Sequence, residues 1–383
     1  MYIILSSING ISIGQTRITS ERTYDLTLED KLLFYMKLAH APSLSACIIK
    51  NNTMVWAKAF GYADVKNSKP ATENTIYMAG SISKTITATA FMQLYEKGYF
   101  DLDDDVNKYL PFSLRNPNFP DKPITIRMLL AHQSSLQDTP TMFLHFLITE
   151  YPYEWLKEYL LPGGCIYDPN VWSSTYAPGE QFSYSNMGYE VLGYIFEIIS
   201  NQTLEEYCQQ HIFNPLDMKH TSFHVSDFDI KDLAVPYFWL LGHYIPFPHY
   251  DIGNKAAGGI RTNVIDLAHF LIAHMNNGIY NNTRILMKET IEIMHSPQYL
   301  NTSEPSFQYG LGWEIHKSKG EIYEGHSGSV FGGVAFMFFR ESDNTGIIFF
   351  VNKNRIIHIR PYILETIGFI GIKNTLFEKA EEL

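Results

Sequence analysis

Ser81 and Lys84 are close enough in the sequence, and of the right types, to act together as a nucleophile and its base. They form an S-x-x-K tetrad where a stretch with helical spacing of apolar residues begins. Residues three apart on a helix share a face, so the serine hydroxyl and the lysine amine would project side by side. A serine hydroxyl becomes a strong nucleophile when a neighbouring base, such as a partly desolvated amine, takes its proton. The tetrad predicts an activated serine; the structural alternative is a helix cap followed by a solvated lysine.

Two further short patterns follow along the chain. Tyr184-Ser185-Asn186 precedes a second predicted helix, and His326-Ser327-Gly328 is placed at the start of a predicted strand. Each pattern alone has an ordinary explanation, because Tyr184 could be a half-buried turn residue, Asn186 a helix cap and His326 a strand histidine. The three patterns together, in this order, favour a catalytic site.

The three motifs resemble those of the serine β-lactamase and penicillin-binding-protein superfamily. S-x-x-K, Y-x-N and K/H-x-G are hallmarks of its class C-like branch, which also holds D-alanyl-D-alanine carboxypeptidases, D-aminopeptidases and esterases. The resemblance covers roughly residues 29 to 370. It includes secondary matches in family order, which are Gly61-Tyr62-Ala63, the run from Ile124 to His132, the run from Pro178 to Asn186, and Ala257-Gly258-Gly259.

The resemblance implies a catalytic role for four residues. Ser81 is expected to attack a carbonyl carbon and become acylated, and Lys84 is expected to help remove its proton. Tyr184 is expected to be the general base, either as a phenolate or by sharing a proton with Lys84. An ordinary tyrosine pKa near 10 is too high for this, so a nearby cation must stabilise the phenolate. Lys84 is that cation, and His326 is the candidate for a second one.

The resemblance also implies substrate-binding positions. Asn186 would hydrogen-bond the amide of the substrate. The oxyanion hole would be formed by the backbone N–H groups of Ser81 and Ser329, the latter directly after Gly328 on the predicted strand.

Two positions depart from the family pattern. His326 stands where true class C β-lactamases have lysine, and Ser135 stands where the family usually has glycine. Histidine is a weaker cation for a substrate carboxylate, since it is commonly neutral at pH 7. The His-x-Gly form resembles the DD-peptidase and esterase relatives, and Ser135 is expected only to reshape a loop.

We therefore expect a serine acyl hydrolase of the β-lactamase or penicillin-binding, DD-peptidase-like type. One alternative is an esterase of small or aromatic acyl esters, favoured by His326 and by residues 236–250, which are aromatic and carry no formal charge. Another is a non-catalytic scaffold of the same family, which the intact Ser81, Lys84 and Tyr184 argue against. An α/β-hydrolase is disfavoured, because no serine has a G-x-S-x-G elbow around it.

The predicted elements indicate an α+β fold. Strands lie near both ends of the chain, which predicts one antiparallel sheet built from N- and C-terminal strands, flanked by helices, with a mostly helical region inserted. We expect an N-terminal extension over 1–20, a sheet domain over 21–110 plus 250–383, and a mainly helical region over 111–249.

The sequence predicts residue ranges for several of these helices and strands. A helix is predicted over 27–40, and a hairpin over 44–60 with its turn at Asn51-Asn52. Later strands are predicted over 310–315, 321–325, 333–340 and 346–352, and a closing helix over 360–369. The aromatic run 236–250 is predicted to be either a buried loop or the wall or lid of a pocket.

Composition narrows the possible partners. The chain has 383 residues, of which 45% are hydrophobic and 18% charged, and this is typical of a globular protein. A net charge of −11 argues against nucleic acid and anionic membranes. The expected partner is a small-molecule or peptide-like acyl substrate.

Neither a metal nor any other cofactor is expected. The three widely spaced cysteines include no C-x-x-C, and the 14 histidines include no H-E-x-x-H. Residues 1–14 are apolar but interrupted by polar residues and glycine, so we expect a disordered or strand-like start and no integral membrane span. Oligomeric state and compartment are left open.

Overall fold

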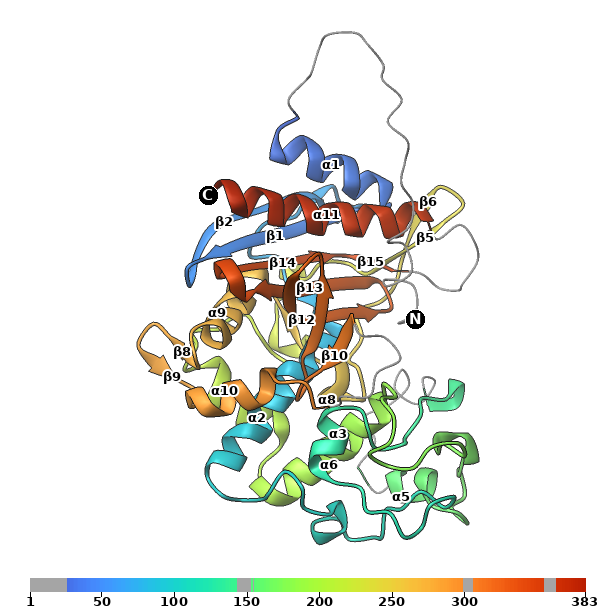
Figure 1. Ribbon diagram of the computed structural model, residues 1–383. Helices are drawn as coiled ribbons and strands as arrows, with labels where there is room; N and C mark the ends of the chain where they lie inside the picture. Colours follow the sequence, from blue (N-terminus) through green and yellow to red (C-terminus); the bar gives the residue numbers. More distant parts are fainter. Residues whose placement is uncertain (1–25, 143–152, 154, 299–305, 355–362) are drawn as a thin grey trace.

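A central antiparallel sheet separates two layers of helices in the computed structural model (Figure 1). The structure describes residues 26–142, 153, 155–298, 306–354 and 363–383. The expected extension 1–20 and the first residues of the predicted closing helix lie outside the described residues. The α+β fold expected from the sequence is confirmed, since strands from the two ends of the chain pair in one sheet.

The largest sheet in the described part of the chain has eight strands. In spatial order they are β10 (Phe307–Tyr309), β11 (Glu314–Ser318), β12 (Glu321–Val330), β13 (Gly333–Arg340), β14 (Thr345–Val351), β1 (Ser43–Lys50), β2 (Thr53–Asp64) and β3 (Lys69–Pro70). The smaller sheets combine β15 (Lys353–Asn354) with β5 (Tyr237–Leu240) and β6 (His243–Pro246), β4 (Tyr77–Met78) with β7 (Arg261–Thr262), and β8 (Ile279–Tyr280) with β9 (Thr283–Arg284).

Strand β1 is buried on both faces and joins the two hydrophobic cores. Its side chains alternate, because successive residues of a strand point to opposite sides of the sheet. Leu44, Ala46 and Ile48 face a core that α1 (Leu28–Leu38) and α11 (Ile363–Glu382) cover. Cys47 and Ile49 face the larger core on the other side, where α9 (Val264–Met275) packs.

The remaining helices lie on the α9 side of the sheet. They are α2 (Ser83–Glu96), α3 (Ile126–Leu130), α5 (Trp155–Leu160), α6 (Asn186–Ser200), α7 (Leu204–Cys208), α8 (Lys255–Gly258) and α10 (Lys288–His295). A π-helical turn over Gln209–Phe213 extends α7, and short 3₁₀ turns cover Gly80–Ile82, Val106–Lys108, Pro169–Val171, Val225–Asp227, Ile230–Asp232 and Glu341–Asp343. None of the helices within the described ranges has the length and apolar character needed to cross a bilayer.

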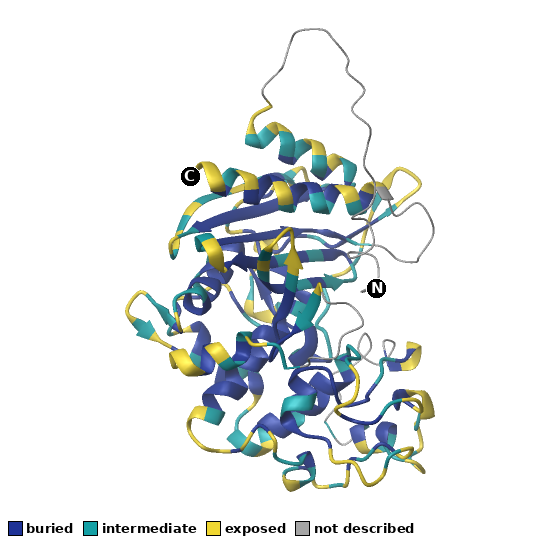
Figure 2. Cartoon of the chain, viewed as in Figure 1, coloured by how far each residue is buried: buried dark blue, intermediate teal, exposed yellow. Residues whose placement is uncertain are grey.

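Helix α2 is the most enclosed of the described helices. Every residue from Ser83 to Leu94 is buried, and the helix is dark blue throughout most of its length in Figure 2. Its polar threonines are satisfied locally, because the Thr85 and Thr89 hydroxyls donate to carbonyls one turn earlier and the Thr87 hydroxyl donates to the Ala256 carbonyl. A polar helix can therefore run through the core without unpaired hydroxyls.

The early elements agree closely with the sequence predictions. Thr27 caps α1 with a capping box shared with Asp30, and the predicted hairpin is β1–β2 with both turn asparagines at positive φ.

Two later strand predictions were wrong in detail, and the local backbone geometry explains both. Of the strand predicted over 310–315, only Glu314 and Ile315 lie in a strand, because the chain turns at Gly312 (φ +82°) between β10 and β11. The strand predicted to end at Gly325 continues to Val330, so His326 lies inside β12 and not at its start. A Cβ at Gly325 would lie 2.0 Å from the Met337 carbonyl oxygen, so this glycine serves close packing on β13 and does not end the strand.

Residues 236–250 are not the buried loop that was one of the two predictions, and their role as the wall or lid of a pocket stays a prediction. Most of the run is the hairpin β5–β6, whose turn places Leu241 and Gly242 at positive φ. Leucine is unusual at such a turn position, where asparagine, aspartate or glycine is typical, so the sequence did not signal a hairpin.

Valine in place of Gly371 is expected to disturb the packing of α11 on α1. A Cβ at this position would lie 2.1 Å from the Tyr35 ring, so one helix must shift, and overpacking of this kind costs about 1–3 kcal/mol. Thermal unfolding followed by circular dichroism should show a lower Tm. Asn374→Val places the same side chain at an exposed position of the same helix and should change stability by less than about 0.5 kcal/mol. Equal Tm values for the two variants would contradict this packing.

Candidate active site

Ser81 lies in a tight turn that two glycines allow to touch strand β12. Gly80 has φ +55°, and a Cβ there would lie 3.1 Å from the Ser329 backbone nitrogen. A Cβ at Gly328 would lie 2.0 Å from the Ala79 carbonyl oxygen. The backbone of β12 therefore approaches the Ser81 turn more closely than side chains on both partners would permit.

The Lys84 amine is fully buried and has three acceptors around it. Its Nζ donates to Ser81 Oγ at 3.1 Å, to Asn186 Oδ1 at 2.7 Å and to the Ala257 carbonyl oxygen at 2.8 Å. These partners come from the Ser81 turn, from the start of α6 and from α8. Three elements that are distant in sequence therefore converge on one nitrogen.

Burial lowers the pKa of Lys84 to about 7, although the charges of Asp138 and Glu314 act in the opposite direction. A lysine amine removed from water loses the hydration that stabilises its charged form. A large fraction of Lys84 is therefore neutral and able to accept a proton near neutral pH.

The Tyr184 hydroxyl lies against Ser81 but does not have the properties of a phenolate. Burial raises the pKa of Tyr184 well above its ordinary value of 10, and the hydrogen bond with Ser81 only partly opposes this shift. The Lys84 nitrogen lies 4.9 Å from the centre of the Tyr184 ring, over its face. Burial thus disfavours a negative charge on the ring oxygen, and the expected role of Tyr184 as general base stays a prediction.

His132 accepts two hydrogen bonds from the segment that carries Tyr184. The His132 carbonyl accepts the backbone N–H of Ser183 at 2.8 Å, and its ring Nδ1 accepts that of Ser185 at 3.1 Å. The two N–H groups flank Tyr184, whose ring centre lies 4.2 Å from that of His132. His132 itself has φ +58°, a conformation in which asparagine is also tolerated.

His326 is buried, and its surroundings do not favour the positively charged form of its ring. Its Nδ1 lies 2.6 Å from the Ser327 carbonyl oxygen and 3.3 Å from Glu314 Oε1, while its Nε2 lies 2.9 Å from the Tyr309 hydroxyl. Burial lowers the pKa of His326 to about 4, in spite of the Glu314 carboxylate. His326 is therefore neutral at pH 7 and does not supply the second positive charge that the sequence suggested.

Asn186 is held by a carboxylate that the sequence reasoning missed. Asp138 Oδ2 accepts the Asn186 side-chain N–H at 2.6 Å, and Asp138 Oδ1 accepts the backbone N–H groups of Asn186 at 2.7 Å and Met187 at 3.2 Å. Asn186, which was expected to hydrogen-bond the amide of the substrate, thus directs its side-chain NH₂ group at Asp138.

The structure brings together most of the residues that the motifs predicted. Ser81, Lys84, Tyr184 and Asn186 surround one point, and the Gly328–Ser329 backbone lies beside Gly80. His326 belongs to an adjoining group with Tyr309 and Glu314, its ring centre 6.2 Å from that of Tyr184.

Asp138 and Glu314 were missed for different reasons. Asp138 is the only charged residue in the run 128–149, an isolated carboxylate that could have marked a specific contact. Glu314 stood inside a predicted strand, where nothing in the sequence shows that its carboxylate turns inward to the Ser327 N–H at 3.2 Å and hydroxyl at 3.0 Å.

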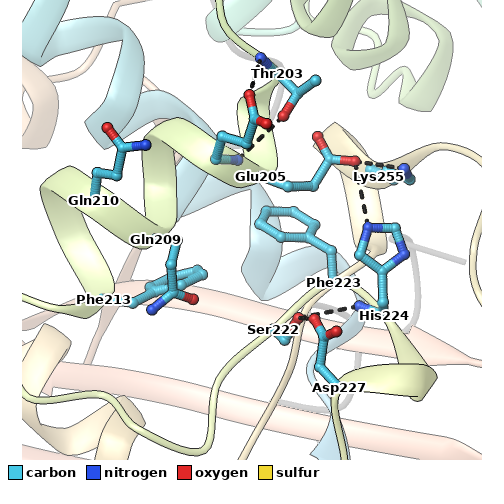
Figure 3. A pocket seen from close by; sticks show the side chains of 11 residues that line it. Thr203, Glu205, Gln209, Gln210, Phe213, Ser222, Phe223, His224, Asp227 and Lys255 are labelled. Atoms are coloured by element: carbon cyan, nitrogen blue, oxygen red, sulfur yellow. Dashed lines mark hydrogen bonds and ion pairs between the residues drawn. The ribbon is translucent and has the colours of Figure 1, made fainter.

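A separate open pocket of about 490 Å³ lies beside α7 and α8 (Figure 3). Glu205 pairs there with Lys255 and lies 3.8 Å from His224 Nε2. None of the motif residues lines this pocket. Helix α8 carries both Lys255, which lines this pocket, and Ala257, whose carbonyl accepts from Lys84.

The comparisons with known proteins agree with this geometry. The family model described as Beta-lactamase matches residues 34–366, which is most of the chain. The chain belongs to the Beta-lactamase family. Its relatives in this family include Protein flp of Staphylococcus aureus strain MW2, 27% identical over 338 residues, and the putative penicillin-binding protein PbpX of Bacillus subtilis strain 168, 30% identical over 314 residues.

Coverage differs between these Beta-lactamase relatives. The match covers 88% of this chain and 64% of Protein flp, and 80% of this chain and 70% of PbpX. The chain thus spans about two thirds of the length of the curated relatives it matches.

Solved structures of other proteins have the same fold. The octameric penicillin-binding protein homologue from Pyrococcus abyssi superposes with a TM-score of 0.76 at 30% identity, covering 91% of this chain and 77% of that one. The D-amino acid amidase from Ochrobactrum anthropi SV3 gives 0.74 at 20% identity, covering 92% and 99%, which is a likeness of fold alone.

The reactivity of Ser81 is expected to rise with pH as Lys84 loses its proton. Since the Lys84 pKa is about 7, Lys84 is mostly protonated below pH 6 and mostly neutral above pH 8. Labelling of Ser81 by a fluorophosphonate, measured by intact-protein mass spectrometry, should therefore accelerate with a midpoint near pH 7. Lys84→Arg should slow labelling at least about 100-fold, because a guanidinium does not lose its proton in this range.

The matched control is Lys97→Arg, at the other end of the same helix, where the lysine contacts Tyr207. This variant should keep the wild-type pH profile. A profile that is flat between pH 6 and 8 in the wild-type protein would contradict the role of the Lys84 amine.

Alanine at His132 is expected to release the Tyr184 segment, whereas asparagine should largely retain it. The asparagine side-chain oxygen can replace Nδ1 as an acceptor, and asparagine tolerates the positive φ. His132→Ala should slow Ser81 labelling about tenfold, and His132→Asn by about threefold at most, since a single hydrogen bond is worth roughly 1 kcal/mol. Equal losses in the two variants would show that the acceptor does not matter.

Proposed function

We propose that this protein is a serine acyl hydrolase that forms an acyl-enzyme at Ser81, of the β-lactamase or penicillin-binding, DD-peptidase-like type. The observation that carries the proposal is the buried Lys84 amine, with a pKa of about 7, 3.1 Å from Ser81 Oγ. A structural lysine would be charged and paired with a carboxylate at this depth. Here the three acceptors are a hydroxyl, an amide oxygen and a backbone carbonyl.

In the acylation step, Ser81 Oγ forms a bond to the carbonyl carbon of the substrate while its proton passes to the neutral Lys84 amine. The carbonyl oxygen becomes an oxyanion, and the backbone N–H groups of Ser81 and Ser329 are the proposed donors to it. When the tetrahedral intermediate collapses, the bond to the leaving nitrogen or oxygen breaks. The Tyr184 hydroxyl, kept protonated by burial, is placed next to Ser81 to pass a proton to that leaving atom and regain one from Lys84.

In the deacylation step, water attacks the acyl carbon and the same groups act in reverse order. The neutral Lys84 amine takes a proton from the water, the ester bond to Ser81 Oγ breaks, and Ser81 Oγ regains a proton from Lys84. The rate of this step would separate a β-lactamase from a penicillin-binding protein, because the latter retains its acyl group.

Two observations bear on the substrate class. The 30% identity to PbpX and to the Pyrococcus abyssi homologue supports a penicillin-type acyl donor. A second candidate, an esterase of small or aromatic acyl esters, is supported by the neutral His326 in front of the ionised Glu314. The pKa of Glu314 is brought to about 2 because His326, His316 and the Ser327 N–H outweigh its burial. A substrate carboxylate gains no ion pair from such a group.

The test is acylation of Ser81 by a fluorescent penicillin, followed by intact-protein mass spectrometry. The wild-type protein is expected to gain the mass of one penicilloyl group, and Ser81→Ala none. The control Ser113→Ala changes a serine distant in sequence from the three motifs and should be acylated like the wild type. Hydrolysis of a short p-nitrophenyl ester by the same proteins tests the esterase, with an expected loss of at least about 1,000-fold in Ser81→Ala.

The outcomes separate the candidates. An adduct that persists indicates a penicillin-binding protein, and one that turns over indicates a β-lactamase. Ester turnover without a penicillin adduct would favour the esterase. If neither reagent reacts with Ser81, the acyl-hydrolase proposal is wrong and a non-catalytic role would replace it.

A further inference from the structure

The carboxylate of Asp138 is the least expected group beside the candidate site. It comes from the segment after α3, and it accepts three N–H groups from the first two residues of α6. The Ser185 hydroxyl lies 3.5 Å from Oδ1 as well. Such a carboxylate at the start of a helix is stabilised by the free N–H groups there, but capping alone does not require a contact with the Asn186 side chain.

The amide of Asn186 can satisfy its neighbours in only one orientation. Its NH₂ group donates to Asp138 Oδ2, so its oxygen must point the other way, toward Lys84 Nζ at 2.7 Å. With the amide reversed, the NH₂ group would face the Lys84 donor and the oxygen would face a carboxylate oxygen. Both of those contacts are repulsive.

We propose that Asp138 is a positioning residue that fixes the Asn186 amide with its oxygen toward Lys84 and, through it, adjusts how strongly the Lys84 amine holds its proton. The inference rests on the proposed acyl-enzyme at Ser81 and adds to it a residue outside the three motifs. Asp138 touches neither Ser81 nor the amine directly. It acts through Asn186 and through its charge.

The electrostatic surroundings of Lys84 support this role. The titratable groups that face the amine are Asp138, Glu314, Tyr184, Tyr189, His132 and His326. Both histidines have lowered pKa values and both tyrosines raised ones, all because of burial, so these four are neutral at pH 7. The two carboxylates are therefore the groups that favour the charged form of Lys84, and Glu314 is already paired with His316 at 2.8 Å.

The first test is Asp138→Asn, which removes the charge and places an NH₂ group against the NH₂ group of Asn186. Without the negative charge, the protonated amine is less stable, so the Lys84 pKa should fall by about one unit. NMR of protein labelled at lysine Cε measures this directly, with the Lys84 signal assigned by its loss in Lys84→Gln. The acid side of the pH profile for Ser81 acylation should move to lower pH by the same amount, and kcat/KM at the optimum should fall about tenfold.

The decisive variant exchanges the two side chains, Asp138→Asn with Asn186→Asp. The hydrogen bonds between the two positions are kept, but the negative charge now lies directly against the Lys84 amine. The Lys84 pKa and the acid side of the profile should therefore move to higher pH, opposite to the shift in the single variant. A purely structural cap does not predict opposite shifts.

The matched control is Asp266→Asn. Asp266 is also buried and also accepts a backbone N–H, from His220, and a hydroxyl, from Thr221, but on α9. Burial raises the pKa of both aspartates. Asp266→Asn should lower stability without moving the Lys84 titration.

The proposal is overturned if the Lys84 titration is unchanged in Asp138→Asn, or if the single and exchanged variants shift in the same direction. If Asp138→Asn does not fold, the exchanged variant alone decides, because its upward shift is measured against the wild type. If no reagent acylates Ser81 in the wild-type protein, the proposed function fails, while the NMR titration still tests Asp138 independently.

Discussion

The burial of one amine is the constraint on which the rest of the site depends. The Lys84 amine can be largely uncharged at pH 7 only where water is excluded. In such a place each N–H group of the amine needs an acceptor from the protein. The Ser81 turn, the start of α6 and the Ala257 carbonyl supply these acceptors from three parts of the chain. The helical region and the sheet must therefore be assembled before the lysine becomes a base.

Helix α2, strand β12 and His132 together keep water away from the Lys84 amine and its neighbours. Helix α2 is buried on every side, and its threonine hydroxyls are satisfied by nearby carbonyls. Two glycines bring β12 against the Ser81 turn at backbone distance, and His132 fixes the segment that carries Tyr184. These contacts place rigid backbone around the reacting groups, which is how enzymes hold a site ready without reorganisation.

The sequence predicted the parts of this site that local patterns carry. Sequence patterns located the first helix, the first hairpin and the helices beside Ser81 and Asn186, and the strands near both ends of the chain identified the α+β fold. Long-range packing was beyond such reasoning. The protonation states of Tyr184 and His326 depend on burial, which no short motif specifies. The role of Gly325 depends on how closely β13 passes, and the contact of Asp138 with Asn186 joins residues 48 apart.

The pairing of β1 with β14 has a consequence for how the protein is made. Ser43 binds Asn352 across 309 residues of sequence, so β1 leaves the ribosome long before its neighbour exists. Until then, an apolar strand with one unpaired edge is exposed, and exposed edges of this kind promote association between chains. Closing such a distant contact is slow, because the chain must lose much freedom first. Synthesis of the last strands is therefore the step that ends the vulnerability of the nascent chain to aggregation.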